Sequence, residues 1–85
     1  MRYRLIIERA AAKQLDRLAR IPEFPRLMAA IDALPDEPRP HGCKKLSAVP
    51  GYRIRVGDYR IVYDIDDTIR LVSVAKVGSR GGIYD

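Results

Sequence analysis

The apolar residues of this chain change their spacing along the sequence, and the changes divide the first half into a strand and two helices. Between Tyr3 and Glu8, apolar and polar side chains alternate as in a half-buried strand. From Arg9 the apolar positions recur every three or four residues, at Ala11, Ala12, Leu15, Leu18 and Ala19. A second stripe begins near Pro22, at Phe24, Leu27, Met28, Ile31 and Leu34. Because only the short, proline-containing segment IPEFP separates the two stripes, we expect a helical hairpin.

The second half of the chain predicts β-structure. Segment 35–42 holds three prolines and one glycine in eight residues, which is typical of a loop. Lys44–Leu46 follows as a short strand, and alternation from Tyr52 continues almost to the end, interrupted at Gly57 and at Asp66. The order β-α-α-β-β-β predicts an α+β fold: an N-terminal strand and a helical hairpin, then a three-to-four-stranded, mostly antiparallel sheet with both helices on one face.

The segment YRIRVGDYRIVY predicts a hairpin with two very different faces. A type II′ turn at Gly57 and Asp58 sets Arg55 opposite Arg60 and Arg53 opposite Val62. One face then carries an apolar and aromatic set, namely Tyr52, Ile54, Val56, Tyr59, Ile61 and Tyr63. The other face carries the three arginines. Like charges directly across a strand pair are destabilising, so this face is interpreted as a binding surface for a polyanion. The alternative is that long arginines extend into solvent and cover apolar surface.

The last two strands extend this basic surface. A three-residue loop Asp66–Thr68 predicts Ile65 opposite Ile69, and the same register places Val74 opposite Arg60. The last strand then runs toward the Gly57 turn, so that the residues after Gly78 emerge at the edge where Arg60 lies. The residues expected to converge on one concave basic surface are Arg53, Arg55, Arg60 and Arg80, with Lys44 and Lys45 at its flank.

Composition agrees with one small folded domain that has an anionic partner. The 85 residues are 47% hydrophobic and 32% charged, as in a globular protein. A chain of this size buries only about 60% of its unfolded surface, so we expect a single domain, residues 1–85, with a small core. Sixteen Lys and Arg against eleven Asp and Glu leave a net charge of +5. A small basic domain of this kind suggests nucleic acid as its partner.

Other features of the sequence bear on the location of the protein in the cell and on its need for a metal or cofactor. No apolar run approaches the roughly 18 residues of a membrane span, and the N-terminal apolar stretch is too short for a signal peptide. The single Cys43 suits a reducing compartment. We therefore expect a cytoplasmic protein with no membrane partner. His41 and Cys43 are two possible metal ligands where structural zinc needs about four, so we expect neither metal nor other cofactor.

The segments GYRIRVGDYRIVYDID and VGSRGGIY, at this spacing, resemble the RelE/ParE superfamily of bacterial toxins, in particular its RelE-like branch. The resemblance covers essentially the whole chain and implies a RelE-like fold. It also implies the toxin of a type II toxin-antitoxin system, which cuts mRNA in the ribosomal A site. Such a ribosome-dependent endoribonuclease is neutralised by a cognate RelB-like antitoxin, with which it forms a hetero-oligomer. The catalytic residues that the resemblance implies are Arg53, Arg55, Arg60, Arg80 and Tyr84, with RNA binding by Lys44 and Lys45 expected beside them.

The implied chemistry is attack of a ribose 2′-hydroxyl on the adjacent phosphate, without a metal. Arginine suits it, because a guanidinium binds phosphate bidentately and stays charged, and preorganised cations stabilise the developing negative charge. Tyr84 would stack on a base or assist proton transfer. The sequence departs from the family in having Arg53 and Arg55 where some members have lysine, and Ser79 where many have histidine. The general base is therefore unidentified.

Two other functions stay open. A toxin of the ParE branch would share the fold and inhibit DNA gyrase by binding, without needing the full set of basic residues and Tyr84. A general RNA-binding module would be served equally well by the basic face alone.

Overall fold

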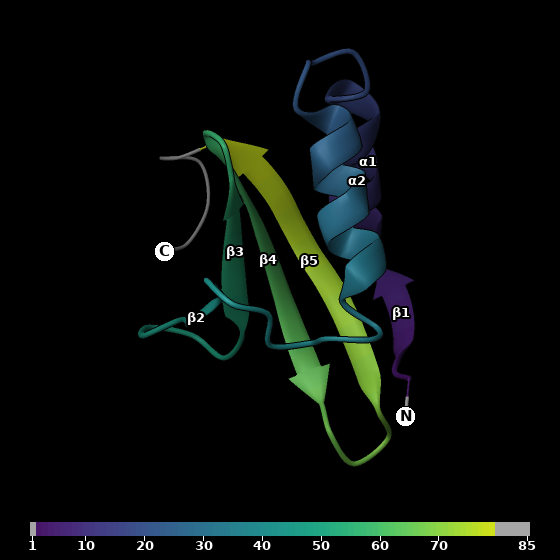
Figure 1. The fold of residues 1–85 in the computed structure, drawn as a ribbon, viewed down its shortest axis with the longest axis vertical. Helices are drawn as coiled ribbons and strands as arrows, with labels where there is room; N and C mark the ends of the chain where they lie inside the picture. Colours follow the sequence, from purple (N-terminus) through teal and green to yellow (C-terminus); the bar gives the residue numbers. More distant parts are fainter. Residues whose placement is uncertain (1, 80–85) are drawn as a thin grey trace.

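The protein is a five-stranded sheet with a pair of helices on one face (Figure 1). The computed structural model describes residues 2–79. The elements in chain order are β1 (Arg4–Ile7), α1 (Arg9–Arg17), α2 (Phe24–Ala33), β2 (Lys44–Lys45), β3 (Tyr52–Val56), β4 (Tyr59–Asp66) and β5 (Leu71–Ser79). The strand order is β1-β5-β4-β3-β2, with β1 parallel to β5 and all other pairs antiparallel. The α+β fold class and the predicted order of elements are confirmed.

The core lies between the helices and the sheet. Ala11 and Leu15 of α1 are buried, as are Leu27 and Ile31 of α2 and Leu34 just after it. The larger residues of the predicted stripes therefore face inward, whereas Ala12 and Ala19 are exposed, as is the charged side of α1. On the sheet side the most deeply buried side chains are Ile61, Tyr63, Val72, Val74 and Val77. The core is therefore a single layer of side chains between the helices and the sheet, as expected for a chain of this length.

The β3–β4 hairpin has the predicted register at every pair, including Arg55 opposite Arg60. Gly57 has φ +59, whereas Asp58 is not among the residues with positive φ, as a type II′ turn requires. The aromatic and aliphatic face of the hairpin packs toward the helices, with Ile61 and Tyr63 in the core. The arginines are therefore on the face of the sheet that the helices leave uncovered.

The predicted register of β4 with β5 is wrong. The turn occupies four residues, 67–70, so that Ile65 lies opposite Val72 rather than Ile69. A side-chain oxygen of Asp66 accepts hydrogen bonds from the amides of Thr68 and Ile69, at 2.9 and 3.2 Å. Arg70 then closes the turn in the left-handed region, at φ +54. Because this conformation favours glycine or asparagine, an arginine there gives no sequence signal.

A β-bulge in β5 adds a second shift. Pairing with β4 skips Ala75, and beyond it Gly78 rather than Val74 lies opposite Arg60. Regular alternation from Val74 would have pointed residue 76 at the helices. Instead Val77 takes the helix side, with 1% of its surface exposed, and Lys76 lies on the far face.

Polar contacts close the end of the sheet opposite the Gly57 turn. Arg39, from the proline-rich loop, lies over the Tyr52 ring, 5.3 Å from its centroid, and forms a 2.9 Å ion pair with Asp67. The Tyr3 hydroxyl donates to the same carboxylate at 2.6 Å. Hydrogen bonds from Arg39 and Tyr3 hold the pKa of Asp67 below its usual value. These contacts tie the loop, the N-terminal segment and the β4–β5 turn together.

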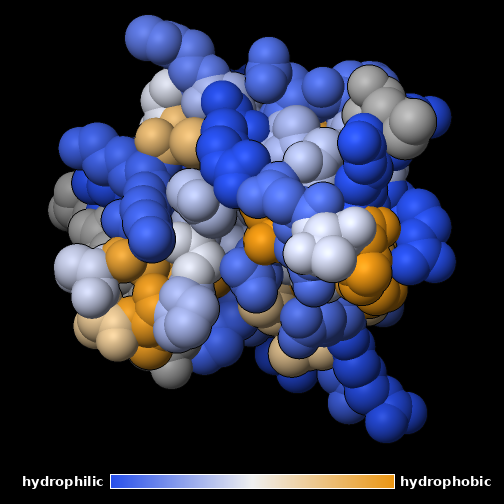
Figure 2. All heavy atoms as spheres, turned by 90° about the horizontal axis from the view of Figure 1, so that it is seen from below, coloured by the Kyte–Doolittle hydropathy of each residue, from blue (hydrophilic) through white to orange (hydrophobic). Residues whose placement is uncertain are grey.

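The end of the molecule seen from below in Figure 1 is mostly hydrophilic, with small apolar patches (Figure 2). Among the described residues the exposed large hydrophobic side chains are Ile6 and Ile69, at 47% and 53% of their surface. Within residues 2–79 no helix is both long and apolar enough to span a bilayer. The same range contains no cluster of three or more His, Cys, Asp or Glu side chains able to hold a metal ion.

Replacing Gly51 tests the close approach of the loop before β3 to β4. Gly51 has φ +122, and a Cβ atom there would lie 2.9 Å from the Tyr63 carbonyl oxygen. We expect Gly51→Ala to lower the free energy of unfolding by about 2–3 kcal/mol, from backbone strain and the displaced β4 carbonyl. Gly42→Ala is the control, because φ is +93 but no atom lies within 4 Å. It should cost about 1 kcal/mol, so equal losses in urea titrations would contradict the contact.

The Asp67 ion pair predicts a pH dependence of stability. Because the folded-state pKa is depressed, the pair stabilises the fold above the unfolded pKa of about 3.9 and is lost as the pH falls through the folded-state value. The difference in unfolding free energy between the wild type and Asp67→Asn should therefore be largest near neutral pH and shrink below about pH 4. Urea titrations across this range measure it, and a difference independent of pH would argue against the ion pair.

Candidate anion-binding site

The face of the sheet away from the helices gathers cations from four strands. In one row across the sheet, Lys44, Arg53, Val62 and Lys76 are directly opposite one another in β2, β3, β4 and β5. In the next row, toward the Gly57 turn, are Arg55, Arg60 and Gly78. Directly opposed residues point to the same side of a sheet, so five cations share this basic face: Lys44, Arg53, Arg55, Arg60 and Lys76.

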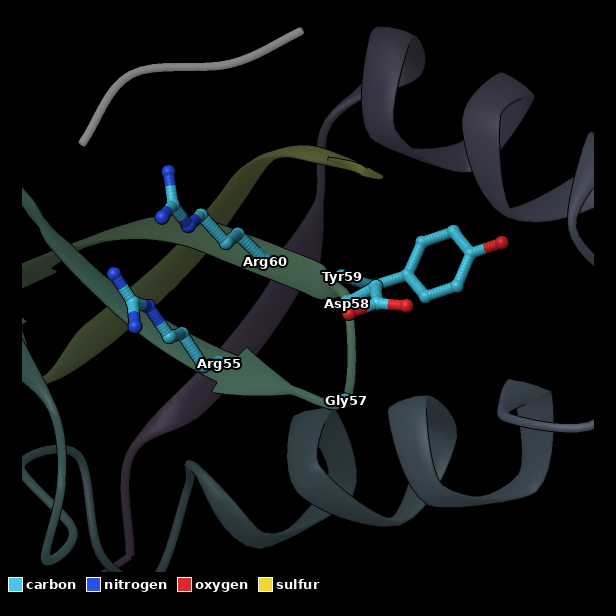
Figure 3. A pocket seen from close by; sticks show the side chains of 5 residues that line it. All are labelled: Arg55, Gly57, Asp58, Tyr59 and Arg60. Carbon is cyan, nitrogen blue, oxygen red and sulfur yellow. The ribbon is translucent and has the colours of Figure 1, made fainter. Parts of the chain in front are cut away.

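Arg55 and Arg60 line the centre of a pocket. Both side chains extend to the same side of the hairpin, with their guanidinium groups near each other (Figure 3). The pocket has a volume of about 170 Å³ and is completed by the turn residues Gly57, Asp58 and Tyr59. That is far more than the roughly 10–15 Å³ needed for one water molecule. Two adjacent guanidiniums bordering such a space are suited to an anion with several oxygen atoms, such as a phosphate.

The basic side chains differ in exposure. Arg53 and Arg60 are buried, with 7% and 4% of their surface exposed, whereas Arg55 is exposed. Arg53, Arg55, Arg60 and Lys76 all have interaction partners in the folded chain. A buried, partnered guanidinium has little conformational freedom left to lose, so Arg53 and Arg60 are held in place before any ligand arrives.

The one carboxylate among the described residues that line this pocket, that of Asp58, does not face its arginines. The Asp58 carboxylate and the Tyr59 ring point away from the two guanidiniums (Figure 3). A guanidinium stays protonated in proteins, so it does not accept a further proton. The two guanidiniums can therefore hold and stabilise negative charge, but they do not take up a proton, and the Asp58 carboxylate of the pocket lining is not directed at the same point.

The structure separates the residues that the sequence suggested. Arg53, Arg55 and Arg60 share one face, and Lys44 joins it opposite Arg53. Lys45 lies opposite Tyr52, on the side of the sheet that carries the tyrosines. Arg80 and Tyr84 lie outside the described residues, and so does any contact between them and this face. The described part of β5 ends at Ser79, opposite Tyr59 and next to Arg60 in the sheet.

Sequence analysis missed Lys76. The signal was present in the segment VSVAKV, where the apolar positions change from a spacing of two, Val72 to Val74, to a spacing of three, Val74 to Val77. Such a break in alternation indicates a bulge. Val77 lies beyond the last pair of β1 with β5, that of Ile7 with Val74, and its amide donates to the side-chain oxygen of Gln14 on α1, at 2.7 Å.

A second hollow, of about 340 Å³, lies between α1 and the end of β5. Among the residues 2–79 that line it, only Arg17 carries a charge, and the others include Leu18 and Val77. The smaller pocket between Arg55 and Arg60 is therefore the better candidate for an anionic ligand.

The chain is similar to known proteins in both sequence and structure. A model of the ParE toxin of the type II toxin-antitoxin system parDE matches residues 5–84. The chain is similar in structure to the archaeal RelE-RelB complex from Pyrococcus horikoshii OT3, with 29% identity and a TM-score of 0.81 over 98% of this chain and 100% of that one. The RelBE2 toxin-antitoxin complex from Mycobacterium tuberculosis matches at 29% identity and a TM-score of 0.69, covering 94% of this chain and 100% of that one.

A third similar structure is the intact RelBE toxin-antitoxin complex of E. coli, with 28% identity, a TM-score of 0.71, and 91% of this chain and 95% of that one covered. No curated protein sequence matches. The family match spans nearly the whole chain, and the structural matches share its complete order of elements. The chain belongs to the ParE toxin family and is a toxin of a type II toxin-antitoxin system, within the RelE/ParE superfamily, with a RelE-like fold.

Proposed function

We propose that this toxin is a ribosome-dependent mRNA endoribonuclease that cuts mRNA in the ribosomal A site. The observation that carries the proposal is the pair Arg55 and Arg60, directly opposed and bordering one pocket, with Arg53 on the same face. Arginines directly opposite one another repel and so destabilise the fold, whereas a phosphate between them would attract both guanidinium groups. The RelE complexes among the similar structures support the same choice.

The proposed reaction is a transfer within the RNA backbone. The 2′-hydroxyl oxygen forms a bond to the adjacent phosphorus, the bond from phosphorus to the 5′-oxygen breaks, and a 2′,3′-cyclic phosphate remains. The 2′-hydroxyl loses a proton and the leaving 5′-oxygen gains one. Extra negative charge develops on the phosphate in the transition state, where Arg55 and Arg60 stabilise it most. The guanidiniums supply the positive charge, so the proposed step is metal-independent.

Proton transfer is assigned to groups beyond the described pocket. Arg80 and Tyr84 belong to the proposed catalytic set, with Arg80 as a further cation and Tyr84 stacking on a base or assisting proton transfer. Ribosomal RNA or the substrate itself is the other source of a proton acceptor. The described part of β5 ends at Ser79, which lies opposite Tyr59 of the pocket lining.

An antitoxin is the proposed protein partner. The similar complexes from P. horikoshii and E. coli each pair a RelE toxin with RelB. For this chain we propose a RelB-like antitoxin that neutralises the toxin in a hetero-oligomer. Acidic side chains laid over the basic face would complement its charge. Ribosome and mRNA as targets place the proposed activity in the cytoplasm.

Inhibition of DNA gyrase is the second candidate function. It is favoured by one observation, that the family model matching the chain is that of the ParE toxin. In this case the basic face would serve binding alone, and no RNA would be cut.

Arg55 is the residue that tests the nuclease proposal with least risk to the fold, because it is exposed while Arg53 and Arg60 are buried. Arg55→Gln should slow cleavage of mRNA on programmed ribosomes by about 10²–10³-fold, as expected for loss of one preorganised charge. Melting curves verify that the variant is folded, because the interaction that Arg55 makes in the folded chain is changed along with its charge. Lys13→Gln, on the exposed side of α1, makes the same change in net charge and should cut at the wild-type rate.

A parallel supercoiling assay separates the two candidates. If the wild-type toxin leaves ribosome-bound mRNA intact while DNA gyrase stops supercoiling, the nuclease proposal is overturned and the gyrase candidate is supported. Cleavage at A-site codons with normal supercoiling gives the reverse conclusion.

A further inference from the structure

One row of the basic face runs straight across four strands. Lys44, Arg53, Val62 and Lys76 come from β2, β3, β4 and β5, each directly opposite the next. Neighbouring strands are about 4.8 Å apart, so the row spans about 14 Å from Lys44 to Lys76. Its two ends are lysines, and the arginine pocket adjoins its middle. The row is thus longer than a pocket for a single phosphate requires.

Lys76 lies in this row because of the β-bulge. Alternation from Val74 without the bulge would aim residue 76 into the core between sheet and helices. With Ala75 skipped, Val77 fills the core and Lys76 turns to the arginine face, where it is half-buried. Bulges next to functional sites commonly re-aim a side chain in this way. An apolar residue at 76 would have allowed a regular strand, but the chain carries a cation and a bulge.

The charges along β4 indicate the direction in which a bound polyanion would lie on the sheet. Arg60 and Val62 share the basic face with Asp64 and Asp66, which follow at intervals of two and are exposed. A polyanion lying along β4 would therefore run from arginine into two carboxylates. Across the strands it meets Lys44, Arg53 and Lys76 instead. Repulsion by Asp64 on one side and attraction by the row on the other favour a path at right angles to the strands.

The ends of the row are more accessible than its middle, because Lys44 is exposed and Lys76 half-buried while Arg53 and Val62 are buried. On β5 the residue opposite Arg60 is Gly78, which has no side chain to fill the space beside the guanidinium. Val62, between Arg53 and Lys76, is the one apolar residue of the row. The row and the pocket together form a strip two residues wide, cationic at both ends of the row and at the pocket.

We propose that Lys44 and Lys76 are the end contacts of a track for single-stranded RNA, which crosses the sheet from β2 to β5 and passes the Arg55–Arg60 pocket. This inference rests on the proposed function, and it adds Lys76 as a residue that positions the substrate. Each lysine contacts a backbone phosphate on its own side of the phosphate at the pocket. Neither lysine takes part in bond breaking.

The test is the salt dependence of binding to an RNA that cannot be cut. A single-stranded RNA of about ten nucleotides with 2′-O-methyl groups lacks the attacking hydroxyl, and fluorescence anisotropy from about 50 to 200 mM salt gives the slope of log K against log salt. Lys44→Gln and Lys76→Gln should each reduce the slope by about 0.7, the value for one phosphate contact on a single strand. Lys76→Arg should keep the wild-type slope, and so should Lys13→Gln on α1. Melting curves verify that each variant is folded.

Several results would overturn the track. They are a wild-type slope in folded Lys44→Gln or Lys76→Gln, an equal loss in Lys13→Gln, no RNA binding by the wild type, or a loss confined to antitoxin binding. Failure of the proposed nuclease would look different. A toxin that binds the uncut RNA with the expected slopes but never cuts ribosome-bound mRNA keeps the track and loses the nuclease. If ribosome-bound mRNA is cut normally while Lys44→Gln and Lys76→Gln leave the salt slope unchanged, the nuclease is supported and the track is overturned.

Discussion

The structure depends on the strict alternation of side chains in the β3–β4 hairpin, held in register by the Gly57 turn. A slip of one residue would turn Tyr63 and Ile61 to the outside and the arginines into the core. Burying one large apolar side chain contributes about 1.5–3 kcal/mol. The opposed pair Arg55 and Arg60 costs about 0.2–1 kcal/mol. Core formation therefore outweighs the repulsion, and the fold itself forces the arginines together.

The basic and acidic residues of β4 lie toward its two opposite ends. The ion pair of Arg39 with Asp67 holds the proline-rich loop at the far end of β4 from Arg60. Asp64 and Asp66 lie toward the same end. The strand is therefore basic near the Gly57 turn and acidic near the other turn. An approaching polyanion is drawn to the arginine end, and because the hairpin is anchored by its core, the cations are in place when it arrives.

The limits of sequence analysis appear at β5. The helices and the first hairpin followed from local periodicity and one glycine turn, and both are confirmed. The β4–β5 register failed for two physical reasons: Asp66 caps a four-residue turn with its side chain, and Arg70 adopts a left-handed conformation that its residue type does not suggest. The bulge at Ala75 then changed the phase again. These errors did not move the hairpin arginines, because their register depends on the Gly57 turn alone, but they concealed Lys76.

The sequence by itself determined the order of the elements, the inward face of each helix and the gathering of Arg53, Arg55 and Arg60 on one side of a hairpin, because periodicity and a short turn are local properties. Only the tertiary structure decided which residues of other strands join them. Lys44 reaches the arginines through the pairing of β2 with β3, and Lys76 through a bulge that lets Val77 enter the core. Burial of Arg53 and Arg60, with Arg55 left exposed, is likewise a property of the assembled sheet. Pairing between strands and packing against helices are long-range interactions, so no single segment of sequence contains them.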